Sequence, residues 1–185
     1  MNIYAMIPAR LGSKRLTRKN IHPFLEKPMI YYAIEACKSS KLIDRVFVST
    51  ESEEIAQIAK EFGADILIRP ENLAEDDVPT QDVMKHFARN FKEMDILVLV
   101  QANSPNVRAE NIDKAINKLI KHNLREVRSV DKHGLENGAI WVANREAIFW
   151  DGLTVYFGVV VDEAVDIHTF EDLKRAEDFE RTRFS

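Results

Sequence analysis

The sequence predicts an α/β fold in three layers, with a mostly parallel sheet between helices. Residues 96–100 (Ile-Leu-Val-Leu-Val) are apolar without alternation, as expected for a strand whose two faces are both covered by helices. Apolar runs of this kind alternate along the chain with segments whose apolar residues recur at helical spacing. Strands that alternate with helices favour parallel pairing, with helices on both faces of the sheet.

Each element is expected from its local pattern. Strands are predicted at residues 3–7, 45–49, 65–68, 96–100, 126–130, 139–142 and 155–161. Helices are predicted at residues 28–39, 53–62, 81–91, 112–120 and 169–179. Thr50 and Glu53 have the spacing of a capping box, and Thr169 and Asp172 are expected to cap the last helix. Gly63 is placed to end its helix in the left-handed conformation.

Length, charge and cysteine content exclude several classes of protein. The 185 residues fit one domain with a sizeable core, and a hydrophobic content of 45% argues against disorder. The net charge is -4 while basic residues gather near the start, which favours a small anionic ligand over a nucleic acid. Cys37 is the only cysteine, so we expect a buried structural thiol in a cytoplasmic protein. No apolar run is long enough for a membrane span, so no membrane partner is expected.

Residues 8–20 form a basic loop directly after the predicted first strand. In open α/β sheets, ligands bind at the carboxyl ends of the strands. Cations at that place favour a polyphosphate, with backbone donors near Gly12 and Ser13 forming a cradle. The glycines of a Walker A loop or a dinucleotide fingerprint are absent, and the alternative is a solvated basic loop. The basic residues of the loop are Arg10, Lys14, Arg15, Arg18 and Lys19.

A second polar loop spans residues 69–80. Arg69 directly follows the strand 65–68, so its side chain is expected to point into the same cleft as the basic loop. Asp76 and Asp77 lie further along this loop. They belong either to the site or to the start of the next helix, where the macrodipole favours negative charge.

A third loop, 101–105, follows the central strand. Gln101 ends the strand, and its amide can both donate and accept, as reading a base edge requires. Asn103 and Ser104 are expected to stabilise a turn there.

Acidic residues late in the chain are candidates for a divalent metal site. Asp162, Glu163 and Asp166 follow the apolar strand 155–161. Magnesium takes hard oxygen ligands, commonly one or two carboxylates completed by phosphate oxygens and water. His168 is a candidate metal ligand or general base, and the alternative is an exposed polar residue near a helix start.

Taken in order, these segments resemble the acylneuraminate cytidylyltransferases, the CMP-sialic acid synthetases. Residues 7–15 (Ile-Pro-Ala-Arg-Leu-Gly-Ser-Lys-Arg), followed by residues 19–21 (Lys-Asn-Ile), are similar to the nucleotide-binding signature of that family. The resemblance runs from one end of the chain to the other. Its other segments lie at residues 48–56, 69–70, 73–76, 101, 104–105, 137–140 and 165–169.

The resemblance implies a Rossmann-like nucleotidyltransferase fold and transfer of CMP from CTP to a 2-keto sugar acid, with release of pyrophosphate. It implies catalytic roles for Arg10, Lys19 and Asp166, with Asp166 binding the cofactor Mg²⁺. Arg69, Thr80 and Gln101 would contact the cytidine portion, Thr80 standing where the family usually has serine. Together with the basic loop, the residues expected to bind the nucleotide are Arg10, Gly12, Ser13, Lys14, Lys19, Asn20, Arg69, Thr80 and Gln101.

Two departures from the family's pattern bear on function. His168 stands where the family usually has a second acid, and imidazole is a poor replacement for a hard oxygen ligand. Either one carboxylate suffices with phosphates and water, or Asp162 or Glu163 compensates. The family also has a longer excursion before the segment 137–140, which supports dimerisation and part of the sugar site. We therefore expect residues 1–185 to form a single domain that lacks most of this insert, and a homodimer that its absence weakens.

Three functional hypotheses follow. The leading one is a Mg²⁺-dependent cytidylyltransferase whose partners are CTP and a sialic-acid-like sugar acid. The first alternative is a related nucleotidyltransferase for another acid, such as 3-deoxy-manno-octulosonate, because acceptor contacts are what the shortened segment lacks. The second alternative, which His168 suggests, is a nucleotide-binding module with little catalysis.

Overall fold

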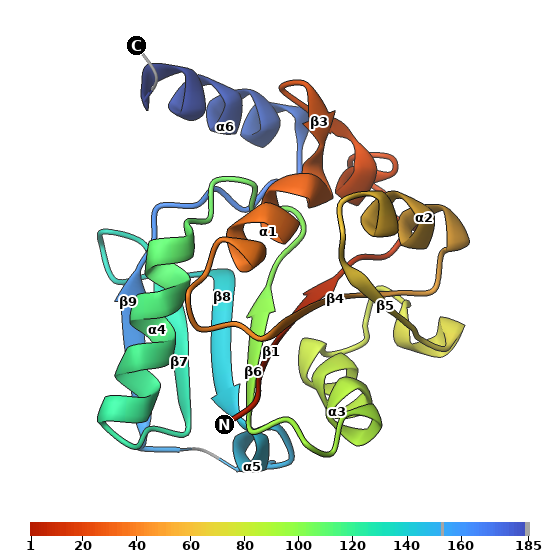
Figure 1. Ribbon diagram of the computed structural model, residues 1–185. Helices are drawn as coiled ribbons and strands as arrows, with labels where there is room; N and C mark the ends of the chain where they lie inside the picture. Colours follow the sequence, from red (N-terminus) through yellow and green to blue (C-terminus); the bar gives the residue numbers. More distant parts are fainter. Residues whose placement is uncertain (153, 184–185) are drawn as a thin grey trace.

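The computed structural model describes residues 1–152 and 154–183 and shows a seven-stranded sheet with helices on both faces (Figure 1). The strands of this sheet are β1 (Ile3–Pro8), β4 (Arg45–Thr50), β5 (Asp65–Ile68), β6 (Ile96–Val100), β7 (Glu126–Val130), β8 (Glu136–Asn144) and β9 (Phe157–Val161). The helices are α1 (Met29–Lys38), α2 (Glu53–Glu61), α3 (Thr80–Asn90), α4 (Ala109–Lys121), α5 (Arg145–Ile148) and α6 (Phe170–Arg183). The short elements are β2 (Pro23–Phe24), β3 (Lys27–Pro28) and the 3-10 turns η1 (Lys19–Ile21) and η2 (Glu71–Leu73).

The sheet is mostly parallel, as predicted. Its strand order is β5-β4-β1-β6-β8-β7-β9, and β1 pairs in parallel with both β4 and β6. Strand β8 runs antiparallel to β6 and β7, while β7 and β9 pair in parallel. The carboxyl ends of β1, β4 and β6 therefore lie next to one another at one edge of the sheet, and the loops that leave them share a common space.

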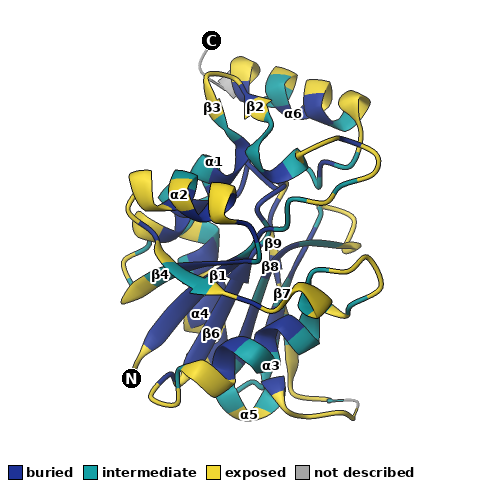
Figure 2. Ribbon diagram, turned by 90° about the vertical axis from the view of Figure 1, so that its right-hand side faces the viewer, coloured by how far each residue is buried: buried dark blue, intermediate teal, exposed yellow. Residues whose placement is uncertain are grey.

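Two hydrophobic clusters lie on the two faces of the sheet and confirm the three-layer arrangement. One joins β1 and β6 to helices α1, α2 and α4, and it contains the fully buried thiol of Cys37. The other joins the opposite side chains of the same strands to α3 and α5. Figure 2 shows the strands buried between these layers, with exposed residues on the outer sides of the helices. In the described part of the chain, no helix combines the length and apolar character needed to cross a membrane.

Helix α6 lies apart from the sheet, beside the β2–β3 hairpin (Figure 1). Leu173 and Ala176 of this helix pack with Phe24 and Met29 in a third, smaller cluster. Glu180 accepts hydrogen bonds from Asn106 and Arg108, so a buried polar network joins α6 to the start of α4. The segment between β9 and α6 is thereby held across the carboxyl edge of the sheet.

Two of the three motifs predicted at helix ends are confirmed, while helices α4 (Ala109–Lys121) and α6 (Phe170–Arg183) extend beyond the predicted ranges 112–120 and 169–179. Gly63 follows α2 with a φ of +79°, as predicted. At the start of α6, the Asp172 amide donates to Thr169 Oγ1, and the Thr169 amide donates to Asp172 Oδ2. The capping box of Thr50 and Glu53 is wrong. Ser52 is the N-cap of α2, because its hydroxyl accepts from the Ile55 amide, whereas the Thr50 hydroxyl accepts from the Ser52 amide.

Candidate active site

A cavity of about 580 Å³ opens at the carboxyl edge of the sheet, between the loops that follow β1, β5 and β6. The structure brings every residue predicted for the site to the wall of this one cavity. These residues are Arg10, Gly12, Ser13, Lys14, Lys19, Asn20, Arg69, Thr80, Gln101 and Asp166. Sequence positions as far apart as Arg10 and Asp166 thus share a single space.

The loop after β1 is fixed in place by hydrogen bonds from its backbone. The Ala9 amide donates to the Ser49 carbonyl of β4, and the Leu11 amide donates to Glu51 Oε1. Asn20 is buried and donates from Nδ2 to the Arg10 carbonyl at 2.9 Å, so it closes the loop on itself. A Cβ on Gly12 would meet no atom within 4 Å, so the backbone at this point lies open to the cavity.

Two cations of this loop converge on one carboxylate. Arg10 and Lys14 each lie 2.5 Å from an oxygen of Asp76, and Arg10 also donates to the Ala74 carbonyl. The hydrogen bonds from Lys14 and Arg10 hold the pKa of Asp76 below its usual range. Asp76 precedes α3 by several residues, so the interpretation of this residue as a helix-end charge is wrong. It belongs to the cavity.

Arg69 lies at the end of β5, as predicted, but most of its side chain is buried. Its guanidinium pairs with Glu51 at 3.1 Å, and only 3% of the side chain is exposed. Burial lowers the pKa of Arg69 while the neighbouring Glu51 charge opposes that shift. Because Glu51 also accepts from the Leu11 amide, this ion pair joins β5 to the basic loop.

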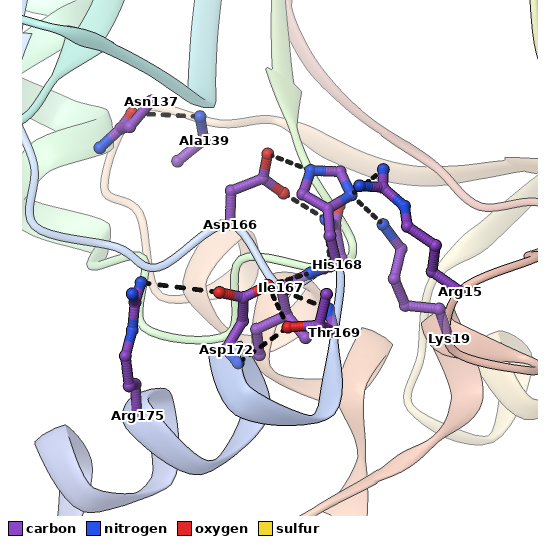
Figure 3. Close-up of polar contacts among 11 residues, drawn as sticks. Arg15, Lys19, Asn137, Ala139, Asp166, Ile167, His168, Thr169, Asp172 and Arg175 are labelled. Carbon is purple, nitrogen blue, oxygen red and sulfur yellow. Dashed lines mark hydrogen bonds and ion pairs between the residues drawn. The ribbon is translucent and has the colours of Figure 1, made fainter.

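A second polar cluster of the cavity surrounds Asp166 (Figure 3). His168 Nε2 lies 2.7 Å from Asp166 Oδ2, and Asn103 donates to Asp166 Oδ1. On its other side, His168 Nδ1 lies 3.1 Å from a guanidinium nitrogen of Arg15 and 3.4 Å from Lys19 Nζ. Burial lowers the pKa of Lys19, and the Asp166 charge opposes that shift.

The other two acids proposed near the metal site do not lie in it. Asp162 is 1% exposed, and its carboxylate accepts from the Ala164 amide and from Asn111 Nδ2 of α4. Glu163 is exposed and does not line the cavity. The expectation that one of them replaces the family's second acid is therefore wrong. Each is directed elsewhere by the turn that ends β9.

The donor atoms in the cavity fit a cation most of whose ligands come from phosphate oxygens and water rather than from the protein. The acids on the wall are Glu75, Asp76 and Asp166, and Asp76 is bound by Arg10 and Lys14. Among the described residues, no group of three or more acidic, histidine or cysteine side chains is arranged to hold a metal ion. Asp166 is outside that ion pair, and one carboxylate suits Mg²⁺, which commonly completes its coordination with phosphate oxygens and water.

Two residues of the cavity have contacts that the sequence analysis did not predict. Asn103 was expected only to stabilise a turn, yet it is buried and donates to Asp166. Arg15 was one basic residue among five, and its contact with His168 has no local signal. Asn103 was the more predictable of the two, because it closely follows Gln101 at the end of the central strand.

Comparison with known proteins identifies the family of this chain. The family described as cytidylyltransferase matches residues 4–182. N-acylneuraminate cytidylyltransferase of Escherichia coli O18:K1:H7 is 39% identical over 114 residues, which cover 62% of this chain and 27% of the relative. The enzyme of the same name from Streptococcus agalactiae serotype III is 29% identical over 213 residues, covering 93% of this chain and 52% of the relative. The chain thus spans between about a quarter and about half the length of these curated relatives.

Solved structures share the fold at low sequence identity. A CMP:2-keto-3-deoxy-manno-octonic acid synthetase complexed with CTP superposes with a TM-score of 0.82 at 14% identity, over 99% of this chain and 100% of that one. Rv0371C of Mycobacterium tuberculosis H37Rv, in complex with manganese, superposes with a TM-score of 0.71 at 14% identity, over 96% and 99% of the two chains. The match over residues 4–182 and the relatives named N-acylneuraminate cytidylyltransferase confirm the resemblance read from the sequence. The chain belongs to the cytidylyltransferase family.

Proposed function

We propose that this protein transfers CMP from CTP to a 2-keto sugar acid and releases pyrophosphate. The observation that supports it most is the shared cavity. Arg10, Lys14, Arg15 and Lys19 of the basic loop line this cavity together with Gln101 after β6, Thr80 at the start of α3, and Asp166 from the segment before α6. This arrangement offers separate regions for a triphosphate, a base and a metal ion.

In the proposed reaction, the anomeric hydroxyl oxygen of the acid attacks the α-phosphorus in line. The new oxygen–phosphorus bond forms as the bond to the bridging oxygen of pyrophosphate breaks, and the proton of the hydroxyl passes to water. Such chemistry requires positioning and charge stabilisation more than a covalent nucleophile. Arg10, Lys14 and Lys19 would offset the negative charge of the phosphates, and backbone amides at Gly12 and Ser13 would complete the cradle.

The roles on the nucleoside side follow from the same geometry. The Gln101 amide can donate to and accept from the edge of a cytosine. Thr80 would offer its hydroxyl at the start of α3. We propose that Arg69 contributes to cytidine binding mainly by shaping the cavity wall, because its guanidinium is already paired with Glu51.

We propose Mg²⁺ as the metal, bound through Asp166. When bound, the ion would neutralise charge on the phosphates and help pyrophosphate to leave. Asn103 and His168 would hold the carboxylate, since both contact it.

The structure also favours a second acceptor class within the same reaction. Between β7 and β8 the chain makes only a tight turn, in which the Asp131 carboxylate accepts from the amides of His133 and Leu135. The acceptor contacts expected from a longer excursion at this point are therefore missing. This observation favours an acceptor that makes fewer contacts with the protein, such as 3-deoxy-manno-octulosonate.

We further propose that residues 1–185 act as one catalytic domain in the cytoplasm, where CTP is available. The buried, unpaired Cys37 is compatible with a reducing compartment. Because the β7–β8 turn is short, we expect at most a weak homodimer, which sedimentation velocity over a range of protein concentrations would measure.

The experiment is pyrophosphate release from CTP with a panel of acids that includes N-acetylneuraminate and 3-deoxy-manno-octulosonate. ATP, GTP and UTP serve as nucleotide controls. Turnover with one acid and CTP supports the proposal and selects the acceptor. Calorimetric binding of CTP without turnover on any acid would instead favour a nucleotide-binding module.

A further inference from the structure

His168 is placed between the proposed metal-binding carboxylate and two cations of the basic loop (Figure 3). Its Nε2 atom lies 2.7 Å from Asp166 Oδ2. Its Nδ1 atom lies 3.1 Å from a nitrogen of Arg15 and 3.4 Å from Lys19 Nζ. The imidazole thus contacts Asp166 on one side and the basic loop on the other.

These contacts fix which ring nitrogen carries the hydrogen. Guanidinium and ammonium groups have only hydrogens to offer, so Nδ1 must accept from Arg15 and Lys19. A neutral imidazole with a free pair on Nδ1 carries its hydrogen on Nε2, which therefore donates to Asp166. A metal ion bound at Nε2 would need the hydrogen on Nδ1, where it would face two positively charged donors. The geometry disfavours His168 as a metal ligand.

The Asp166 carboxylate is held from both sides. Asn103 donates to its Oδ1 atom and also to the Ile167 carbonyl at 2.9 Å, so the amide is tied to the same segment as the carboxylate. His168 donates to Oδ2. Neighbouring groups that hold a metal ligand commonly set its orientation and its affinity for the ion.

We propose that His168 is a positioning residue for Asp166, the carboxylate that would bind the divalent cation together with the phosphates of the nucleotide. This inference rests on the proposed function. One carboxylate stands near Lys19 and Arg15, so the local charge repels a free cation. A bound triphosphate reverses that charge and supplies further oxygen ligands.

The test uses Mn²⁺ as a paramagnetic probe, alone and with CTP, in the absence of any sugar acid. Electron paramagnetic resonance measures the bound ion, and electron spin echo modulation detects a directly coordinated imidazole nitrogen. We expect the intact protein to bind Mn²⁺ at least about tenfold more tightly with CTP than without it, and to show no coordinated imidazole.

Two variants separate positioning from ligation. His168→Gln keeps a donor and an acceptor on one side chain, so its affinity for Mn²⁺ in the presence of CTP should stay within about threefold of the parent. His168→Ala loses the donor to Asp166 and should lose about tenfold or more, as is typical when a group holding a metal ligand is removed. Circular dichroism and CTP binding without metal check that both variants fold.

Other outcomes overturn the inference. A coordinated imidazole nitrogen in the parent that disappears in His168→Gln would make His168 a ligand. Equal Mn²⁺ affinity with and without CTP would contradict joint uptake. If the parent binds no CTP at all in calorimetry, the proposed function fails together with the inference, whereas a coordinated imidazole leaves the proposed function intact.

Discussion

The carboxylate of Asp76 lies 2.5 Å from the guanidinium of Arg10, where the proposed triphosphate would bind. Lys14 approaches the other oxygen of the same carboxylate. Asp76 lies in the loop between η2 and α3, and it pairs with two cations that we propose bind the triphosphate. We therefore expect its carboxylate to compete with a phosphate group for these cations.

We predict that Asp76→Asn binds CTP more tightly than the parent. An amide competes less well than a carboxylate for Arg10 and Lys14, and the gain should be about two- to fivefold because exposed ion pairs are weak. Isothermal titration calorimetry measures it. Asp77→Asn is the matched control, because it removes the same charge from the next residue, which does not line the cavity. Weaker binding by Asp76→Asn would show that Asp76 holds the cations in the loaded site.

Arg10→Ala should lower kcat/KM for pyrophosphate release roughly 100-fold, or about 3 kcal/mol, the scale of removing one preorganised donor. Arg18→Ala is the control. It removes a cation from the same loop, but Arg18 pairs with Glu54 and does not line the cavity. Full activity in Arg10→Ala would remove the catalytic role assigned to this residue.

The Arg69–Glu51 pair should be important for stability. Glu51→Ala leaves a buried guanidinium without its partner and should lower the free energy of unfolding by about 3 kcal/mol. Asp65→Ala breaks the exposed pair with Arg45 and should cost less than about 1 kcal/mol. Urea unfolding of both variants gives the comparison. Equal costs would mean that the Arg69 pair contributes no more than a surface contact.

Local patterns in the sequence predict the strands of the large sheet and helices α1, α2, α3, α4 and α6, whereas helix α5 and the β2–β3 hairpin are not predicted. The run 96–100 indicates β6 because an entirely apolar strand needs cover on both faces, and β6 is indeed buried throughout. The positions of Arg10, Arg69 and Gln101 in one cavity follow from the same reasoning, since each comes directly after a parallel strand.

Contacts between side chains far apart in the chain are not predictable in this way. Asp162 and Asp166 look alike as acids after β9, yet a turn directs one to α4 and the other to the cavity. Asp76 pairs with Arg10 only because η2 brings the loop back over β1. Such pairings depend on tertiary geometry, which residue type and spacing do not record.

Cys37 should be unreactive in the folded protein. Burial raises the pKa of its thiol well above the ordinary value, so very little thiolate is present at neutral pH. We expect a thiol reagent such as dithionitrobenzoate to react with the native protein only at the rate at which the chain opens, and at once in denaturant. Cys37 is the only cysteine, so the signal has a single source. Fast reaction without denaturant would contradict the burial of this thiol.

His86 of α3 should make the protein less stable in mild acid. Burial, together with the charges of Arg69 and Arg89, holds the pKa of His86 below its ordinary value. As the pH falls, the unfolded chain therefore protonates His86 before the folded chain does. The contribution of His86 to the free energy of unfolding is present above the unfolded-state pKa of about 6.5, and it is lost as the pH falls through the folded-state pKa. His86→Gln removes the titration, and its free energy of unfolding should gain on the parent between about pH 7.5 and about pH 5. His122→Gln, at an exposed histidine beyond the end of α4, is the matched control for the substitution itself. Chemical unfolding at several pH values gives both curves, and parallel curves for the parent and His86→Gln would show that His86 titrates alike in the folded and unfolded chain.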